Sequence, residues 1–208
     1  MASVIWEKRA WPIYWQFLEK RGSSNFTEQK TLLRPVLRLL RSYEVVVLGD
    51  REFRSVELAS WLDAQDVYFA WRQKQGTYIQ LEGQDEQRLD SLGLAPGMKM
   101  YITGVSVTKK KGFSNLAIAA YWKRKYRGTA PDEGWYILTN LGSLKAALDA
   151  YKARSGIEAM FKDCKTGGYN LEGSKASVER LTRLVLLIAL AYTCAGLHGR
   201  KVKQLGKH

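Results

Sequence analysis

The sequence predicts an α/β protein in which a mixed sheet with flanking helices is interrupted by a mostly β segment. The first indication is the aliphatic run of residues 45–48, which ends on Gly49-Asp50 and leads into a helical pattern. A continuous apolar run bounded by glycine is typical of a strand buried on both faces of a mixed or parallel sheet. The second is the block from Val67 to Asn140, where short β patterns alternate with glycine-containing turns.

The elements before this block alternate between strand and helix. Two short strands begin the chain, the first containing Ser3-Val-Ile-Trp-Glu-Lys and the second ending near Glu19. A turn at residues 22–25 leads to a helix from Glu28 to Ser42, because its leucines form one apolar stripe. The strand at 45–49 and a helix at 55–65 complete this part.

The rest of the chain is predicted to be β first and helical afterwards. The expected strands share β-branched and aromatic residues and lie within residues 67–73, 77–81, 98–110, 113–124 and 134–140. One helix is predicted for 143–164 and a last one for 175–198. The apolar run from Leu184 to Leu197 is too short to cross a bilayer, so we interpret it as the buried core of that helix. The basic tail, residues 199–208, is predicted to be disordered.

Composition indicates a polyanionic partner. The 208 residues carry 33 Lys and Arg against 20 acids, a net charge of +13 and a pI near 9.7, which favours nucleic acid binding. Cys164 and Cys194 have neither metal-ligand spacing nor a disulfide pattern. With no signal peptide, we expect a reducing, cytoplasmic location, which excludes a secreted disulfide-bonded class.

Two groups of residues are candidates for chemistry. Residues Tyr151, Arg154, Glu158 and Lys165 follow the spacing Y-x2-R-x3-E-x6-K, which on one helix would point successive side chains to the same face. One acid among three groups that bind phosphate oxygens suits a phosphodiester-cutting site. The alternative is a solvated helix face with one i,i+4 ion pair. Asp50 lies at the carboxyl end of a strand, where a metal-binding carboxylate is expected. Its alternative role is to cap the next helix.

Together these features resemble the DDE transposases of bacterial insertion sequences, in the branch defined by the Y-R-E-K signature. Three blocks occur in the family's order: GDREF, WYILTN and YKARSGIEAMFKDCKTG. The resemblance implies a ribonuclease-H-like fold. It predicts that the first part of the core, a β-rich insertion, the second part of the core and a tail occupy residues 1–66, 67–140, 141–198 and 199–208.

The resemblance also implies a site. Asp50 and Glu158 would be the second and third acids of a two-metal Mg²⁺ centre that cleaves and joins DNA strands. No aspartate occurs in residues 1–49, so the first acid is missing, and we expect a chain that begins after the first strand and is inactive alone. Tyr151, Arg154 and Lys165 would contact phosphates at the element end. Trp135 would stack on a flipped base, although a buried strand tryptophan is an equal alternative.

The expected partner is double-stranded DNA, both the element ends and the target. The resemblance leaves a homodimer on DNA open, predicts no membrane association, and places the protein with the bacterial nucleoid. A basic cluster interleaved with aromatic residues supports DNA contact, with a solvated turn as its alternative; it comprises Lys123, Arg124, Lys125 and Arg127. A non-catalytic DNA-binding or regulatory remnant that pairs with a full-length transposase is the alternative function, and an unrelated ribonuclease-H-like nuclease is a third.

Overall fold

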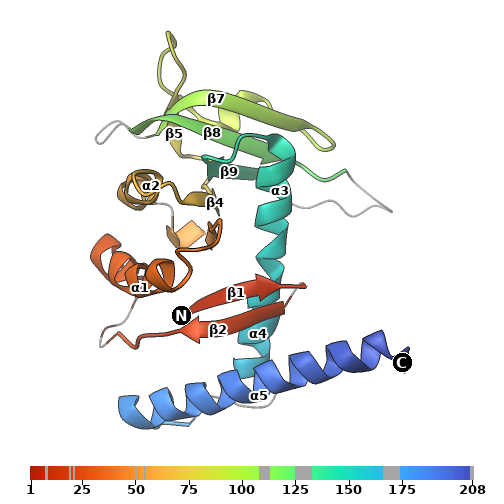
Figure 1. Ribbon diagram of the computed structural model, residues 1–208. Helices are drawn as coiled ribbons and strands as arrows, with labels where there is room; N and C mark the ends of the chain where they lie inside the picture. The colour runs from red at the N-terminus through yellow and green to blue at the C-terminus, as the bar shows by residue number, and fades with distance from the viewer. Residues whose placement is uncertain are drawn as a thin grey trace. The chain divides into compact units, whose positions relative to one another are not determined.

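The protein forms two compact units, each with its own core (Figure 1). The computed structural model describes residues 1–7, 9–18, 20, 22–49, 51–53, 55–107, 113–124, 133–165 and 174–206. The first unit, which we call the hairpin unit, comprises residues 1–22, 32–36 and 153–208. The second, the sheet unit, comprises residues 23–31 and 37–152.

The hairpin unit begins with two antiparallel strands, β1 (Ala2–Trp6) and β2 (Arg9–Tyr14), which confirm the two strands predicted there. Trp6 pairs with Arg9 at the closed end, where Glu7 adopts a left-handed φ of 49°. Helices α4 (Ser155–Lys165) and α5 (Val178–Gln204) complete the unit. Its core forms where Ala10 of β2 meets Met160 of α4 and Ile188 of α5. Burial of apolar surface therefore joins segments that are distant in sequence.

Helix α5 differs from its prediction in two respects. Ser177 caps its start by accepting a hydrogen bond from the Arg180 amide, and the helix continues to Gln204. The predicted disorder of the tail is therefore wrong for residues 199–204. The predicted burial is also wrong, because five leucines are exposed, namely Leu184, Leu186, Leu187, Leu190 and Leu197. The helix buries Val185, Ile188 and Ala189 instead.

The full length of α5 also bears on membrane association. Its 27 residues, with a mean hydropathy of 1.6 in the most apolar window, are long and apolar enough to span a bilayer, unlike the shorter run considered in the sequence. A single helix that passes this test is weak grounds for a membrane protein, because core helices of globular proteins have similar composition.

The sheet unit contains a seven-stranded sheet with the order β3-β4-β9-β8-β7-β5-β6. Its strands are β3 (Val46–Gly49), β4 (Tyr68–Arg72), β5 (Tyr78–Gln80), β6 (Gln87–Arg88), β7 (Lys99–Val107), β8 (Phe113–Tyr121) and β9 (Trp135–Thr139). Strands β3 and β4 are parallel and the other pairs are antiparallel. This arrangement confirms the predicted mixed α/β class and the strands predicted between residues 67 and 140.

Strand β3 is not buried on both faces. It lies at one edge of the sheet, and residues 46–48 are half-buried while Gly49 is buried. Because β3 pairs with β4, it belongs to the same sheet as the strands of the predicted insertion. The domain boundaries at residues 66 and 140 stay predictions.

The helices before the sheet's central strands begin at local capping groups. Asn25 and Glu28 exchange hydrogen bonds with each other's backbone amides at the start of α1 (Phe26–Leu39), a capping box. Ser55 accepts a hydrogen bond from the Leu58 amide at the start of α2 (Val56–Asp63). Ser55 therefore holds the capping position of α2 that the alternative interpretation assigned to Asp50. Two short 3₁₀ helices, η1 (Arg51–Phe53) and η2 (Leu89–Leu92), also occur.

The predicted single helix at 143–164 is two helices. Helix α3 (Leu144–Ala153) ends before Arg154, and α4 begins at Ser155. At the break the Ile157 amide bonds to the Arg154 carbonyl 2.9 Å away, a tighter turn than an α-helix makes. Ser155 and Gly156 are poor helix formers, which gives the break a local cause. The assumption that the four signature residues share one helix face is therefore wrong.

Candidate active site

The carboxyl ends of the parallel strands β3 and β4 lie at the same end of the sheet. We call this end the carboxyl edge, as distinct from the outermost strand β3. Gly49 is the last residue of β3 and is in register with Trp71, and Arg72 ends β4 beside Ile137. Because β9 runs antiparallel to β4, the segment that leads into β9 lies at this same edge. The residue that follows Gly49 is Asp50, which lies outside the described residues, whereas its neighbours Gly49 and Arg51 are described. Gly49 and Arg51, the two neighbours of Asp50, thus lie at the position predicted from the sequence.

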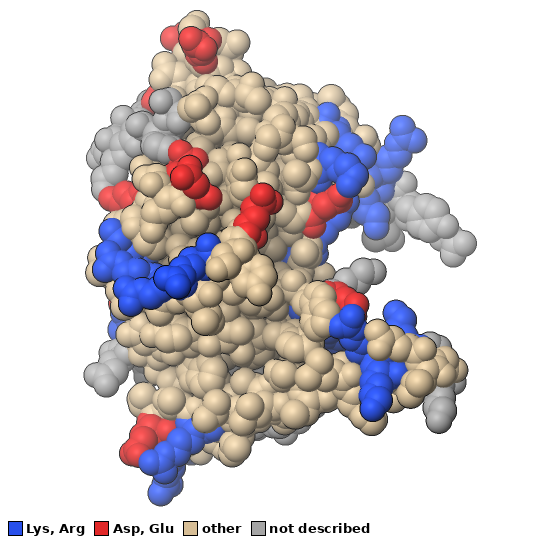
Figure 2. Space-filling view, viewed as in Figure 1, with Lys and Arg blue, Asp and Glu red and all other residues tan. Residues whose placement is uncertain are grey.

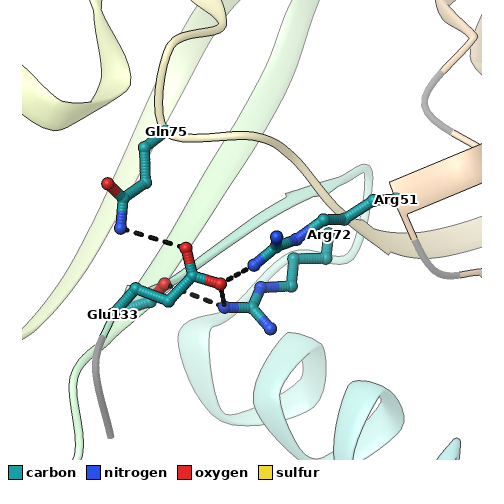
Figure 3. A network of polar contacts seen from close by, with 5 residues as sticks. Arg51, Arg72, Gln75 and Glu133 are labelled. Carbon is teal, nitrogen blue, oxygen red and sulfur yellow. Dashed lines mark hydrogen bonds and ion pairs between the residues drawn. The ribbon is translucent and has the colours of Figure 1, made fainter.

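A polar network occupies this edge (Figure 3). Glu133 accepts a hydrogen bond from Nη2 of Arg72 at 2.5 Å and one from Nε2 of Gln75 at 3.3 Å, and it forms an ion pair with Arg51. Arg72 also donates to the Gly134 carbonyl at 3.4 Å. Three chain segments therefore converge on one carboxylate: the start of η1, the end of β4 and the approach to β9.

The sequence analysis did not identify Glu133 or Arg72. An acid before a strand is usually part of a solvated turn, and nothing in its spacing indicates two arginine partners. The network contains two guanidinium groups and one carboxylate, so its net charge is positive. Two cations around one half-buried acid are suited to hold the loops in place.

The chain turns sharply directly before Asp50. A Cβ atom built on Gly49 would lie 2.6 Å from Cβ of Phe53 and 2.9 Å from its Cγ. Contacts of that length between carbon atoms are strongly repulsive, so a side chain at position 49 requires the backbone to move. Glycine at this position allows η1 to fold back against the end of β3.

Trp135 begins β9 and contacts two tyrosines edge to face. Its ring centroid lies 5.2 Å from that of Tyr151 and 6.1 Å from that of Tyr121, with interplanar angles of 72° and 83°. Trp135 is half-buried, whereas Tyr151 is only 4% exposed and belongs to the core cluster of Ala70, Ile137 and their neighbours. Tyr151 thus supports the tryptophan from the core side, and its ring is not presented to solvent.

Arg154 and Glu158 form an ion pair in the hairpin unit. The Glu158 side chain is 60% exposed in the first turn of α4, while that of Arg154 is mostly buried. The i,i+4 pair of the alternative interpretation is therefore present. The Glu158 carboxylate remains at the surface, where a metal ion can reach it. Lys165 ends α4, and its side chain lies outside the description.

The two acids expected to share metal ions belong to different units. Residues adjoining Asp50 are in the sheet unit and Glu158 is in the hairpin unit, so their predicted proximity stays a prediction. Within the described parts of the chain, no three His, Cys, Asp or Glu side chains cluster as a metal site would require. The donor chemistry still suits Mg²⁺, because carboxylate oxygens are its preferred protein ligands and Glu158 is accessible.

The basic cluster is described in part. Lys123 and Arg124 are exposed after β8, and the aliphatic stem of Arg124 lies over Gly97, whose Cβ would be 2.8 Å from the arginine Cγ. The other two members, Lys125 and Arg127, lie outside the described residues, as do Lys109, Lys110 and Lys111. Figure 2 shows Lys and Arg in several separate groups, with acids between them, on the face that it draws.

Comparison with known proteins gives one family. The sequence model of the family described as "Transposase DDE domain" matches residues 19–194. This stretch contains Asp50, Trp135 and all four residues of the Y-R-E-K spacing. No curated protein sequence matched the chain.

Proposed function

This chain belongs to the transposase DDE domain family, whose members are metal-dependent enzymes that cleave DNA, and we propose that it acts in the transposition of a bacterial insertion sequence. The observation that carries the proposal is the extent of the match, which spans most of the 208 residues and both candidate acids. The mixed sheet, with residue 50 directly after a strand that has a parallel neighbour, supports a ribonuclease-H-like core.

We assign metal binding to Asp50 and Glu158, whose carboxylates should lie within roughly 8 Å of each other because paired ions are about 3.5–4 Å apart. When bound, Mg²⁺ ions activate the attacking oxygen and stabilise the leaving one. Glu158 forms an ion pair with Arg154. The Arg154 guanidinium beside this carboxylate has the charge and planar donor geometry to bind a phosphate oxygen of the DNA.

The remaining proposed residues contact DNA. Lys165 and Arg154 would hold phosphates near the cleavage point, and Lys123, Arg124, Lys125 and Arg127 would hold them elsewhere along the duplex. Trp135 would stack on a base flipped from the element end, and Tyr151, which backs its ring, would fix its orientation. Tyr151 is accordingly a positioning residue in this proposal.

A second function is favoured by one feature of the sequence. Residues 1–49 contain no aspartate, and the acids that we assign to the site are two, Asp50 and Glu158. Two carboxylates hold a pair of ions weakly, and we therefore propose that the chain alone binds DNA without cleaving it. It would act as a regulatory partner of a full-length transposase, with which it could share a DNA end.

Metal binding tests the assignment independently of activity. Electron paramagnetic resonance of Mn²⁺ with the purified protein and duplex DNA should show bound ion that Glu158→Gln weakens by roughly tenfold or more. Glu179→Gln is the matched control, because Glu179 forms the same i,i+4 pair with Arg183 on an exposed helix face. Equal Mn²⁺ binding by the two variants would remove Glu158 from the site.

Cleavage is tested separately with supercoiled plasmid and either Mg²⁺ or Mn²⁺. The chain alone should leave the plasmid intact. Nicking that disappears in Asp50→Ala would establish an active enzyme and contradict the regulatory function.

A further inference from the structure

A groove in the hairpin unit has features that the transposase site does not use. It lies between the β1–β2 hairpin and the C-terminal part of α5, and its volume is about 940 Å³. Three aromatic side chains and three cations line it, namely Trp6, Trp11, Tyr192, Arg9, Arg200 and Lys203. Aromatic faces beside cations are the combination that binds bases and phosphates of single-stranded nucleic acid.

The aromatic part of the groove is held in a fixed arrangement. Trp6 and Trp11 meet edge to face, with centroids 5.2 Å apart and an interplanar angle of 64°. The guanidinium carbon of Arg200 lies 4.2 Å from the centroid of the Trp6 ring, a cation–π contact. Trp6 is nevertheless 40% exposed, so part of its ring remains accessible.

Two glycines on α5 keep the groove open. Gly199 has no atom within 4 Å of where its Cβ would be, and the Cβ of Gly196 would lie 3.6 Å from Cζ2 of Trp11. Glycine inside a helix costs stability relative to alanine. Gly196 and Gly199 therefore lower the stability of α5, but the absence of their side chains leaves the tryptophans accessible.

The cations of the groove are available to a ligand. Arg9 and Lys203 form no ion pair with any residue that the structure describes. Arg200 has one acidic neighbour, Glu7, whose Oε1 is 3.8 Å from its Nε. That separation is at the limit of an ion pair, so a phosphate could replace the carboxylate at little cost. The hydroxyl of Tyr192 is buried and has no hydrogen-bond partner among the described residues, so it is not counted among the groups that a ligand reaches.

We propose that this groove binds unpaired nucleotides of single-stranded DNA, with a base against the tryptophans and adjacent phosphates at Arg9, Arg200 and Lys203. A base inside a duplex has both faces stacked on its neighbours, so stacking on Trp6 favours unpaired bases over all but the terminal pair of a duplex. The site is distinct from the proposed metal site and does not depend on Asp50 or Glu158.

The test is fluorescence anisotropy with labelled oligothymidine and with a blunt duplex of the same length. The wild-type protein should bind oligothymidine, and Trp6→Ala or Trp11→Ala should weaken that binding roughly fivefold or more, the usual effect of losing one stacked base. Lys203→Ala should weaken it, whereas Lys201→Ala, two positions away on the same helix and outside the groove, should have a much smaller effect. Glu7→Gln should strengthen it by removing the only acid that lines the groove among the described residues.

Gly199→Leu is a variant that should obstruct the groove without destabilising α5. It separates a loss of binding from a loss of folding. Leucine has a higher helix propensity than glycine and meets no atom at its Cβ, so circular dichroism should show an intact helix. The leucine side chain should occupy the part of the groove next to position 199 and weaken oligothymidine binding roughly fivefold or more. Retained binding in this variant would overturn the proposal, as would equal affinity for the blunt duplex or tighter binding of oligouridine, which would indicate a duplex or RNA ligand.

A further variant separates this site from the proposed catalytic one. Glu158→Gln should leave oligothymidine affinity unchanged. A change of affinity in that variant, in either direction, would mean that the oligonucleotide binds at the metal site instead.

Discussion

Nη2 of Arg72, at the end of β4, lies 2.5 Å from Oε1 of Glu133, two residues before Trp135. This contact joins the end of β4 to the segment that leads into β9 and its tryptophan. Arg51, the residue after Asp50, binds the same carboxylate. The network therefore couples the loop that carries one candidate acid to the start of β9.

Removal of this carboxylate should destabilise the protein. Glu133→Ala removes the carboxylate that Arg51 and Arg72 share, and we expect a loss of about 1–3 kcal/mol in the free energy of unfolding, measured by urea denaturation. Asp149→Asn is the control, because Asp149 forms exposed ion pairs with Lys145 and Lys152, and its loss should be smaller. A smaller effect of Glu133→Ala than of the control would mean that the network is loosely held.

Gly49→Ala should destabilise the turn before Asp50. The new methyl group would lie 2.6 Å from Phe53, so the backbone must shift, at a cost of about 1–3 kcal/mol. Gly142→Ala is the matched control, since no atom lies within 4 Å of its Cβ position. Thermal denaturation followed by circular dichroism should show a lower Tm for Gly49→Ala alone. Equal Tm values would indicate that Phe53 moves aside freely.

Neighbouring residues of α5 should respond oppositely to substitution. Ile188 is 6% exposed within the core of the hairpin unit, and Ile188→Ala should cost about 2 kcal/mol or more. Leu187 is 62% exposed, so Leu187→Gln should be nearly neutral. Urea denaturation measures both. A large loss for Leu187→Gln would support the expectation from the sequence that the run from Leu184 to Leu197 is buried.

DNA binding should depend on the basic cluster and on salt. Affinity for duplex DNA should fall between about 50 and 200 mM salt by roughly 10³-fold if about six phosphates are engaged. Alanine at Lys123, Arg124, Lys125 and Arg127 should flatten that dependence. Alanine at Arg38 and Arg41, which are exposed on and after α1, serves as the control. An unchanged salt slope in the cluster variant would identify an ordinary solvated turn.

Trp135→Ala should weaken binding only to DNA ends that can flip a base, by roughly 1–3 kcal/mol. Electrophoretic mobility shifts with a matched end and with one bearing a mismatch at the flipped position compare the two substrates. Because Trp135 packs against Tyr121 and Tyr151, the Tm of the variant must be measured alongside. An equal loss on both substrates would assign the tryptophan to the core.

The sequence by itself determined the secondary structure of most of the chain and its family. The strands between Val67 and Asn140 and the helix near residues 55–65 follow from local patterns of apolar residues, glycine and caps. Such patterns extend over a few residues, so they can be recognised from the sequence without knowledge of the tertiary structure. The match over residues 19–194 confirms the predicted DDE transposase family, whereas the branch given by the signature residues stays a prediction.

Only the tertiary structure decided which side chains meet and which remain exposed. Arg72 and Glu133 are 61 positions apart, and their contact exists because β4 and β9 pair antiparallel. The exposure of Leu187 beside buried Ile188 depends on which face of α5 the hairpin covers, and the aromatic groove depends on the same packing. Burial and long-range ion pairs are set by neighbours distant in sequence, which no local pattern encodes.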